Sequence, residues 1–398
     1  MTTNTSFDIT QPLPQGTVLL AASAGTGKTW TISAVCAKAI ATGLVHMENL
    51  LLVTFNRSAA RELRGRVYER LVNTRLLLAG AREPSDPCDW SLIRCGQAGL
   101  TRVESALDNF DRAVITTTHE FASRMLVELG VLSDHDPSSV LMTDLAPLAT
   151  EVSDDHYLAQ YLDCDRPPSV RDKRELSRDV AVKYGEVPIF SKDDADTPVQ
   201  DVLWALSVRE DVRRRSRSRS VHTFDDLIGD LVKALRDPYR GPLACATLAH
   251  RFGLVMVDEF QDTDPLQWEI LRRAFHGHSN LWLIGDPKQS IYAFRGADIH
   301  AYQDAAQSAS HVLHLDVNYR TDKPIVEAVN TLFSNAQLGH DISMELVTAH
   351  HQESRIKTAA TDGPRYHWSQ PFQIRCLQAP AGAQLNTATS DQLSLIHI

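Results

Sequence analysis

Short runs of consecutive apolar residues recur along the chain and predict buried strands. They lie at residues 18–21, 50–55, 113–118, 254–257, 281–284 and 312–315. Unbroken apolar runs are typical of parallel strands that are covered on both faces. Between them, apolar residues recur at helical spacing, as in residues 32–40 and 63–71. Strands that alternate with helices predict an α/β fold built on a parallel sheet.

The first apolar run leads into a phosphate-binding loop (P-loop), Ala22-Ser23-Ala24-Gly25-Thr26-Gly27-Lys28-Thr29, with Ala22 where the usual pattern has its first glycine. Gly25 and Gly27 allow backbone N–H groups to turn inward around phosphates, and a helix that starts near Lys28 points its positive end at them. Lys28 then supplies charge to the phosphates, and the Thr29 hydroxyl supplies a Mg²⁺ ligand. A glycine-rich turn that binds nothing is the alternative, but Lys-Thr in a strand–loop–helix context favours phosphate binding.

Polar residues that follow later strands complete a candidate hydrolytic site. The run 254–257 ends in Asp258 and Glu259, a pair that suits one Mg²⁺ ligand and one base acting on water. Gln289 follows the run 281–284 and, opposite a P-loop, can sense a γ-phosphate. Arg320 follows the last run, and we expect it to reach the γ-phosphate from a second domain.

Other residues at strand ends point to nucleic acid. Thr54-Phe55-Asn56 closes the second strand and precedes an arginine-rich helix, which suits contact with a nucleic-acid backbone. A solvated arginine face is the alternative. His119 follows the run 113–118, where a structural or DNA-backbone contact is commoner than a catalytic base. Tyr292 and Phe294 can stack on bases from the same loop as Gln289.

Length and composition limit the class of protein. A chain of 398 residues predicts two or three domains. The net charge of −10 argues against non-specific coating of nucleic acid but allows a locally basic channel. The six cysteines have no CxxC or CxxH spacing, so we expect a reducing cytoplasm and neither a zinc site nor a disulfide framework. We also expect no membrane association, because no apolar run is long enough to span a bilayer and no signal-peptide pattern is present.

Six ordered strings carry a resemblance to a known family. AASAGTGKT, VTFNRSAARELRGR, TTTHEFASRML, VDEFQDTDPLQ, IGDPKQSIYAFRGAD and LDVNYRT resemble the motifs of UvrD/Rep-type superfamily 1 DNA helicases. Within that family they are most similar to the RecB-type beta subunit of exodeoxyribonuclease V, over about residues 15–130 and 220–335. The resemblance implies an ATP-dependent 3′–5′ DNA helicase and DNA-dependent ATPase that uses ATP and Mg²⁺. It also implies repair of double-strand breaks, single- and double-stranded DNA as substrates, and RecC-like and RecD-like partner subunits.

The resemblance assigns a role to each matching residue. Lys28 and Thr29 bind phosphate and Mg²⁺, Asp258 holds the Mg²⁺, and Glu259 is the base. Gln289 and Arg320 contact the γ-phosphate. The single strand of DNA would lie along Thr54, Phe55, Asn56, His119, Tyr292 and Phe294, and Arg295 would bridge the DNA and nucleotide sites.

The fold implied is a RecA-like P-loop NTPase sheet with an inserted helical subdomain. Residues 1–130 and 221–315 would form the first RecA-like domain, 131–220 the inserted subdomain, and 316–380 the beginning of a second RecA-like domain. Residues 78–101, which are rich in proline and small residues, are expected to be an insertion rather than part of the core. The arginine run 213–219 either binds duplex phosphates or forms a mobile charged loop.

The chain also departs from the family pattern. It ends before a further arginine finger and before a nuclease domain, so we expect a truncated product in which residues 381–398 (ending DQLSLIHI) are not a native domain end. Two other functions stay open at this point. One is a stand-alone UvrD/Rep-like helicase. The other is a fragment that binds ATP and DNA without unwinding, because an arginine finger contributes strongly to the hydrolysis rate.

Overall fold

A computed structural model describes residues 5–133, 140–142, 144–181, 199–290, 298–334, 336, 342, 344–353 and 355. The chain divides into two compact units. The first contains Met1–Asp316 and Leu338–Ile342, and the second contains Val317–Gln337 and Ser343–Ile398. Each unit is described by itself.

The first unit is built on a seven-stranded sheet in the order β1-β9-β2-β8-β7-β3-β4. All neighbouring strands in it run parallel. The strands are β1 (Thr5–Ser6), β2 (Thr17–Ala22), β3 (Leu50–Thr54), β4 (Val114–Thr117), β7 (Leu254–Val257), β8 (Asn280–Gly285) and β9 (His311–Leu315). The predicted α/β fold with a parallel sheet is confirmed, and each apolar run corresponds to a strand. Strand β1 was not predicted because it is only two residues long.

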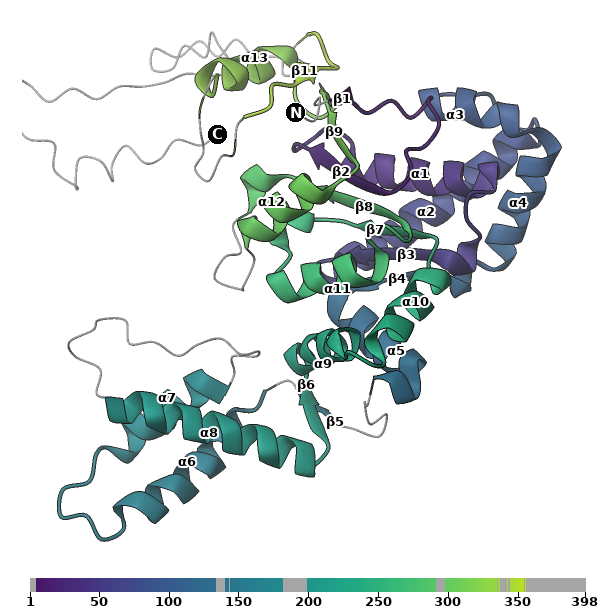
Figure 1. Ribbon diagram of the computed structural model, residues 1–398. Coiled ribbons are helices and arrows are strands. Elements are labelled where there is room, and N and C mark those ends of the chain that lie inside the picture. Colours follow the sequence, from purple (N-terminus) through teal and green to yellow (C-terminus); the bar gives the residue numbers. More distant parts are fainter. Residues whose placement is uncertain are drawn as a thin grey trace, which may run out of the picture. The chain divides into compact units, whose positions relative to one another are not determined.

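Helices cover both faces of the sheet (Figure 1). One layer contains α1 (Lys28–Thr42), α2 (Arg57–Leu78), α3 (Pro87–Leu92) and α4 (Gly96–Asp108). The other contains α5 (Thr118–Leu129), α9 (Phe224–Arg236), α10 (Gly241–Arg251), α11 (Pro265–Phe275) and α12 (Ile299–Ser308). Short 3₁₀ turns lie at η1 (Met47–Asn49), η2 (Ile93–Cys95), η3 (Phe110–Arg112), η4 (Gly130–Leu132), η5 (Phe260–Asp262) and η6 (Pro287–Gln289).

Each central strand contributes to two hydrophobic cores. Leu52 and Met256 pack with α1 and α2 on one face, whereas Leu51 and Val255 pack with α5 and α11 on the other. Successive side chains of a strand point to opposite faces, so a strand covered on both sides must be apolar at every position. The unbroken apolar runs in the sequence therefore have a direct structural cause.

The expectation that residues 78–101 are an insertion outside the core is wrong. Cys88 and Leu92 on α3 are fully buried in the first core. Beneath them, the carboxylate of Asp89 accepts hydrogen bonds from Arg70 at 3.0 Å and from Ser85 at 2.9 Å. The prolines in this stretch suggested an insertion. Pro87 instead occupies the first turn of α3, a position that favours proline.

Residues 144–181 and 199–218 form a separate helical cluster. Helices α6 (Ala146–Tyr161), α7 (Val170–Ala181) and α8 (Val199–Ser218) pack around their own apolar residues, including Val152, Trp204 and Val208. Strands β5 (Val140–Met142) and β6 (Val221–Thr223) pair in parallel at the junction. The described part of the chain has no helix long and apolar enough to cross a membrane.

The arginine run lies mostly on α8, so the alternative of a mobile loop is wrong for residues 213–218. Arg215 pairs with Glu151 at 2.9 Å and with Asp155 at 2.7 Å, and Arg219 pairs with Glu151 at 2.6 Å. These ion pairs hold the end of α8 against α6. Binding of duplex phosphates by this run stays a prediction.

The second unit contains α13 (Lys323–Leu332), together with β10 (Val317–Asn318) and β11 (Thr348–Ala349), which pair in parallel. The tail 381–398 lies outside the described residues.

We predict that Glu269→Gln lowers stability at neutral pH by about 1 kcal/mol or less, because solvent screens partly exposed ion pairs. Glu269 on α11 accepts hydrogen bonds from Arg236 on α9 (2.8 Å) and Arg273 (2.7 Å). The hydrogen bond from Arg236 is the main reason that the pKa of Glu269 is lowered to about 2 from its ordinary value of 4.5. A lowered carboxyl pKa stabilises the fold above the unfolded pKa, and this contribution is lost as pH falls from 4.5 towards 2. Thermal unfolding of both proteins between pH 7.5 and pH 2.5 should show the difference shrinking below pH 4.5.

The matched control is Glu104→Gln, at an exposed position on α4. It should leave the melting temperature unchanged across the same range. A stability difference for Glu269→Gln that is independent of pH would show that its ion pairs are not the cause.

Candidate active site

The residues with candidate chemistry gather where the parallel strands end. Strands β2, β8, β7, β3 and β4 are consecutive in the sheet, and their carboxyl ends lie on one edge. The P-loop follows β2, residues 286–290 follow β8, and residues 258–262 follow β7. Crevices outside the carboxyl ends of parallel strands are the usual ligand sites of open α/β sheets.

The P-loop has the backbone geometry that phosphate binding requires. Gly25 and Gly27 have φ values of +81° and +85°, a region that residues with side chains rarely adopt. The Thr26 hydroxyl donates to the Ser23 carbonyl at 2.8 Å and closes the loop. Helix α1 begins at Lys28 with no capping side chain and no acidic residue in its first turn. Its first N–H groups therefore face the loop as donors for an anion.

Lys28 lies between the two carboxylates of the acidic pair. Its Nζ is 2.5 Å from Oε2 of Glu259 and 3.6 Å from Oδ1 of Asp258. The Asp258 N–H donates to the Val53 carbonyl at 2.8 Å, which ties the end of β7 to β3. Burial raises the pKa of Asp258 to about 6. The cost of burying this carboxylate is only partly offset by Lys28.

The site fits a Mg²⁺ ion that is shared with phosphate. Asp258 Oδ1 is buried and has no hydrogen-bond partner in the part of the chain that the structure describes. Thr29 directly follows Lys28 as the second residue of α1 and is half-buried. The described residues contain no group of three or more His, Cys, Asp or Glu side chains able to hold a metal alone. Mg²⁺ is commonly bound by one or two carboxylates together with phosphate oxygens and water.

Glu259 has an unusual backbone. Its φ of +54° and ψ of +41° are left-handed, although it is neither glycine nor asparagine. Such a conformation costs on the order of 1–3 kcal/mol and persists only where the surroundings enforce it. Its carboxylate accepts a hydrogen bond at 2.7 Å from Nε2 of Gln261. The strained turn directs a carboxylate towards Lys28.

A second polar network follows β8. Asp286 Oδ2 accepts from Nε2 of Gln289 at 2.7 Å, and Asp286 Oδ1 pairs with Nζ of Lys288 at 2.7 Å. Lys288 also donates to Oγ of Ser23 in the P-loop at 3.2 Å. The predicted sensor Gln289 therefore lies in a network that reaches the P-loop.

Sequence reasoning missed Gln261, Asp286 and Lys288. Each follows the end of a buried strand within a few residues, which is the same positional signal that identified Glu259 and Gln289. Their importance lies in contacts to partners distant in sequence, such as the pair formed by Lys288 and Ser23.

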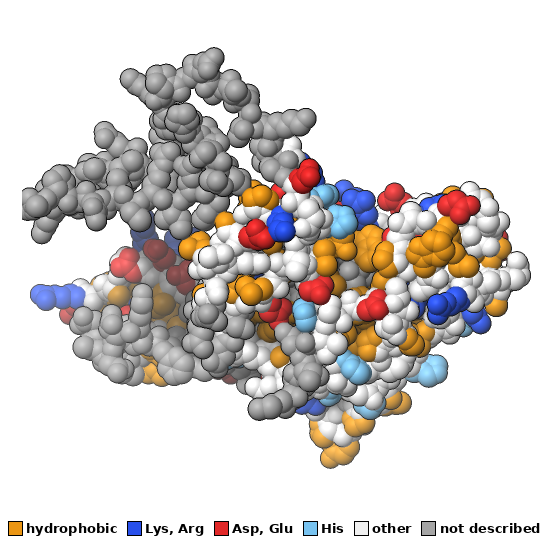
Figure 2. All heavy atoms as spheres, turned by 90° about the horizontal axis from the view of Figure 1, so that it is seen from above, with side chains coloured by type: hydrophobic (Ala, Val, Ile, Leu, Met, Phe, Trp, Pro, Cys, Tyr) orange, Lys and Arg blue, Asp and Glu red, His pale blue; other side chains and the backbone are white. Residues whose placement is uncertain are grey.

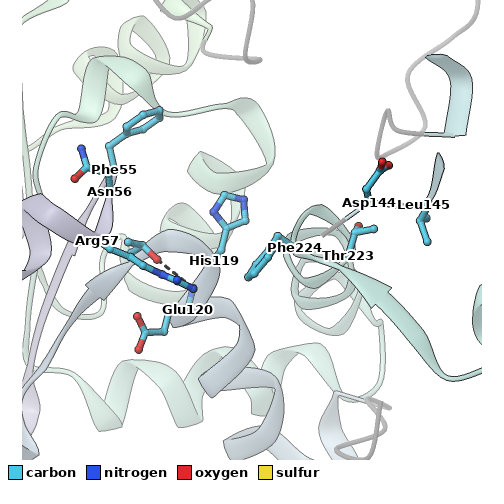
Figure 3. A pocket seen from close by; sticks show the side chains of 10 residues that line it. Phe55, Asn56, Arg57, His119, Glu120, Asp144, Leu145, Thr223 and Phe224 are labelled. Atoms are coloured by element: carbon cyan, nitrogen blue, oxygen red, sulfur yellow. Dashed lines mark hydrogen bonds between the residues drawn. The ribbon is translucent and has the colours of Figure 1, made fainter. Parts of the chain in front are cut away.

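A pocket of about 580 Å³ lies at the adjoining ends of β3 and β4. Its walls are Phe55, Asn56, Arg57, Thr117, His119, Glu120, Asp144, Leu145, Thr223 and Phe224. Figure 3 shows His119 and Phe224 between Phe55 and Asn56 on one side and Asp144 and Leu145 on the other. The rings of His119 and Phe224 meet edge to face, with centroids 6.2 Å apart.

Three predicted residues line this pocket, and one does not. Phe55, Asn56 and His119 are among its walls. Thr54 is the last residue of β3 and is only 1 % exposed, so its side chain faces the core and not the pocket. Phe224 was missed, although an aromatic residue directly after the helix cap Thr223 is a recognisable signal.

The remaining predicted residues are placed elsewhere. Tyr292, Phe294 and Arg295 lie outside the described residues. Arg320 belongs to the second unit. There its N–H donates to Oδ1 of Asn318 at 2.9 Å, and its carbonyl accepts from Arg355 at 2.6 Å. On the face shown in Figure 2, Lys and Arg side chains are scattered among acidic, histidine and apolar ones.

A parallel sheet with a P-loop after β2 and a carboxylate pair after β7 defines a P-loop NTPase fold. The family model described as the UvrD/REP helicase N-terminal domain matches residues 3–310. The chain belongs to this family, as the sequence motifs predicted. Membership implies the use of a nucleotide.

Similar proteins support the resemblance to RecB. The RecBCD enzyme subunit RecB of Mycolicibacterium smegmatis is 38% identical over 94% of this chain and 34% of its own length. The RecB subunit of Escherichia coli is 46% identical over 32% of this chain and 11% of its own length. The ATP-dependent DNA helicase UvrD1 of Mycobacterium bovis is 28% identical over 80% of this chain and 37% of its own length. The chain thus spans about a third of the mycobacterial RecB subunits that it matches.

We predict that Phe224→Ala weakens binding of single-stranded oligonucleotides about 5- to 160-fold, because a base stacked on an aromatic ring contributes about 1–3 kcal/mol. Fluorescence anisotropy with a labelled oligo-dT measures the change. Tyr239→Ala is the matched control, since Tyr239 is 91% exposed and lies outside the pocket. Equal affinities for wild type and Phe224→Ala would remove Phe224 from the binding surface.

Proposed function

We propose that this chain is the ATP-hydrolysing, DNA-translocating part of a RecB-like helicase. The observation that carries this proposal is the shared edge of the sheet. The candidate nucleotide-binding residues of the first unit follow β2, β8 and β7. Phe55, Asn56, Arg57, His119 and Glu120 of the pocket follow β3 and β4, and β7 lies directly beside β3. A structural change at the nucleotide site can therefore reach DNA in the pocket through two adjacent strands, β7 and β3.

Lys28, Thr29 and Asp258 are the residues that would hold ATP with its Mg²⁺. The bound ion neutralises charge on the phosphates. The backbone N–H groups of Ser23, Ala24 and the residues up to Thr29 surround the phosphates, in the loop that Ala22 begins. Lys28 contacts Glu259 at 2.5 Å, and we propose that it exchanges this contact for the phosphates when ATP binds.

Glu259 then accepts a proton from the attacking water. Once Lys28 has turned to phosphate, the Glu259 carboxylate keeps its hydrogen bond from Gln261 and has an oxygen available for water. Gln289, held by Asp286, and Arg320, from the second unit, are proposed to contact the γ-phosphate and report its loss.

The pocket beyond β3 and β4 is the proposed path of the single strand. Phe55, His119 and Phe224 offer ring faces for bases, and Asn56 and Arg57 offer donors for phosphates. Tyr292, Phe294 and Arg295 extend this path in the proposal, on the strength of their motif alone.

The RecB relatives support a proposal for the cellular role. We propose 3′–5′ movement, action on double-strand breaks in the cytoplasm, and assembly with RecC-like and RecD-like subunits. We also propose a two-part RecA-like domain (1–130 and 221–315), an inserted subdomain (131–220) and the beginning of a second RecA-like domain (316–380). A stand-alone UvrD-like helicase is the second candidate, but identity to UvrD1 is 28%, against 38% for RecB.

We predict that single-stranded DNA stimulates ATP hydrolysis by the chain, and that Lys28→Ala abolishes both basal and stimulated hydrolysis. Loss of the lysine removes the charge that binds the phosphates. A coupled phosphate-release assay with and without oligo-dT measures both rates. Hydrolysis that never exceeds the Lys28→Ala background, with ATP and DNA still bound, would favour the binding fragment over the motor.

We predict that Glu259→Gln retains ATP binding and lowers kcat about 10²- to 10⁴-fold, the usual contribution of a general base. Fluorescent-nucleotide titration measures binding, and steady-state phosphate release measures turnover. An unchanged kcat would exclude Glu259 as the base.

A further inference from the structure

Gln261 lies at the centre of the active site, although it has no role in the function proposed above. It is the second residue of the turn after β7 and is only 2% exposed. Both ends of its carboxamide are used. Nε2 donates to Oε2 of Glu259 at 2.7 Å, and Oε1 accepts from the N–H of Asp286 at 2.9 Å.

The contact to Glu259 is specific in its geometry. Lys28 and Gln261 both contact Oε2 of Glu259, at 2.5 Å and 2.7 Å. Two donors on one oxygen fix the rotation of the carboxylate and leave Oε1 as its other acceptor. When Lys28 turns to phosphate, the Gln261 hydrogen bond is the one that still orients the carboxylate.

The end of β8 is shaped around this side chain. A Cβ added at Gly285 would lie 2.6 Å from Oε1 of Gln261 and 3.0 Å from its backbone nitrogen. The φ of Gly285 is not in the left-handed region, so glycine is needed there for space and not for backbone conformation. The same Cβ would lie 3.2 Å from the Phe260 nitrogen, so Gly285 makes room for the turn after β7, including the Gln261 carboxamide.

Gln261 also ties together the networks of residues that follow β7 and β8. Asp286, whose N–H it binds, holds Lys288 and Gln289 through its carboxylate. The Gln261 carbonyl accepts from the Ser290 hydroxyl at 3.2 Å. One residue therefore connects the strained Glu259 to the turn that carries the predicted γ-phosphate sensor.

We propose that Gln261 is a positioning residue that holds the Glu259 carboxylate in the orientation for water attack and anchors it to the tip of β8. This inference rests on the proposed role of Glu259 as the base. Gln261 touches neither phosphate nor water in this role. Its loss should reduce turnover, because misplacing a catalytic group by about 1 Å can cost on the order of 100-fold in rate.

The test compares Gln261→Met with wild type. Methionine fills a similar volume but can make neither hydrogen bond, so packing is largely kept. We expect kcat for ATP to fall about 10- to 100-fold while KM for ATP stays within about threefold, because the phosphate-binding residues are untouched. A residue needed only for packing would lower the melting temperature and leave the kcat of the folded protein unchanged.

Gly285→Ala is an independent second variant, since the added methyl group must displace the Gln261 carboxamide. We expect a loss of kcat here too, and the loss in the double variant should be smaller than the two single losses combined, because both changes act on the position of residue 261. Wild-type kcat in folded Gln261→Met would overturn the inference, as would fully additive losses in the double variant.

Failure of the proposed function gives a different result. If Glu259→Gln hydrolyses ATP at the wild-type rate, the base assignment fails whatever Gln261 does. If Glu259→Gln is inactive and Gln261→Met is fully active, only the positioning role is lost.

Discussion

The carboxyl ends of neighbouring parallel strands lie on one edge of a sheet, and every candidate site in the first unit depends on this constraint. Residues that are hundreds of positions apart meet there without a separate binding domain. Ser23 after β2 contacts Lys288 after β8, and Asp258 after β7 bonds to Val53 of β3. In the strand order β2-β8-β7-β3-β4, the candidate nucleotide-binding residues follow the first three strands. The pocket that contains Phe55, His119 and Phe224 lies at the ends of the last two.

This arrangement brings the charged side chains of Lys28, Asp258 and Glu259 together at a partly buried site. It also holds the Glu259 backbone in an unfavourable conformation. Asp258 has a raised pKa because it is buried, and Lys28 is its nearest compensation. Glu259 keeps a left-handed backbone that the surrounding contacts must hold. Lys28 Nζ lies 2.5 Å from Glu259 but 3.6 Å from Asp258. In the proposed mechanism Lys28 exchanges Glu259 for phosphate, and the hydrogen bonds of Gln261 limit how far Glu259 can then move.

The parts of this molecule that could be predicted from sequence are those that depend on a short continuous stretch of residues. Apolar runs marked the strands because both faces of the sheet are covered. The P-loop and the acidic pair were recognisable because glycine, lysine and carboxylates at a strand end have few other uses.

The parts that could not be predicted depend on contacts between distant residues. Gln261 and Asp286 are 25 positions apart and meet only because β7 pairs with β8. Thr54 was assigned to DNA together with Phe55, but the alternation of the strand turns its side chain into the core. Proline-containing α3 was taken for an insertion. The partner of its buried Asp89 is Arg70 on α2, a contact that no short stretch of sequence reveals.

The central claim is that nucleotide binding at the P-loop and DNA binding in the pocket at the ends of β3 and β4 change each other's affinity. The most direct measurement is the affinity of the hydrolysis-deficient Glu259→Gln variant for a fluorescent ATP analogue, with and without saturating oligo-dT. Coupled sites predict a change of at least about fivefold in that affinity, and the same factor in oligo-dT affinity with and without nucleotide. Identical nucleotide affinities under both conditions, with DNA shown to be bound, would contradict the claim.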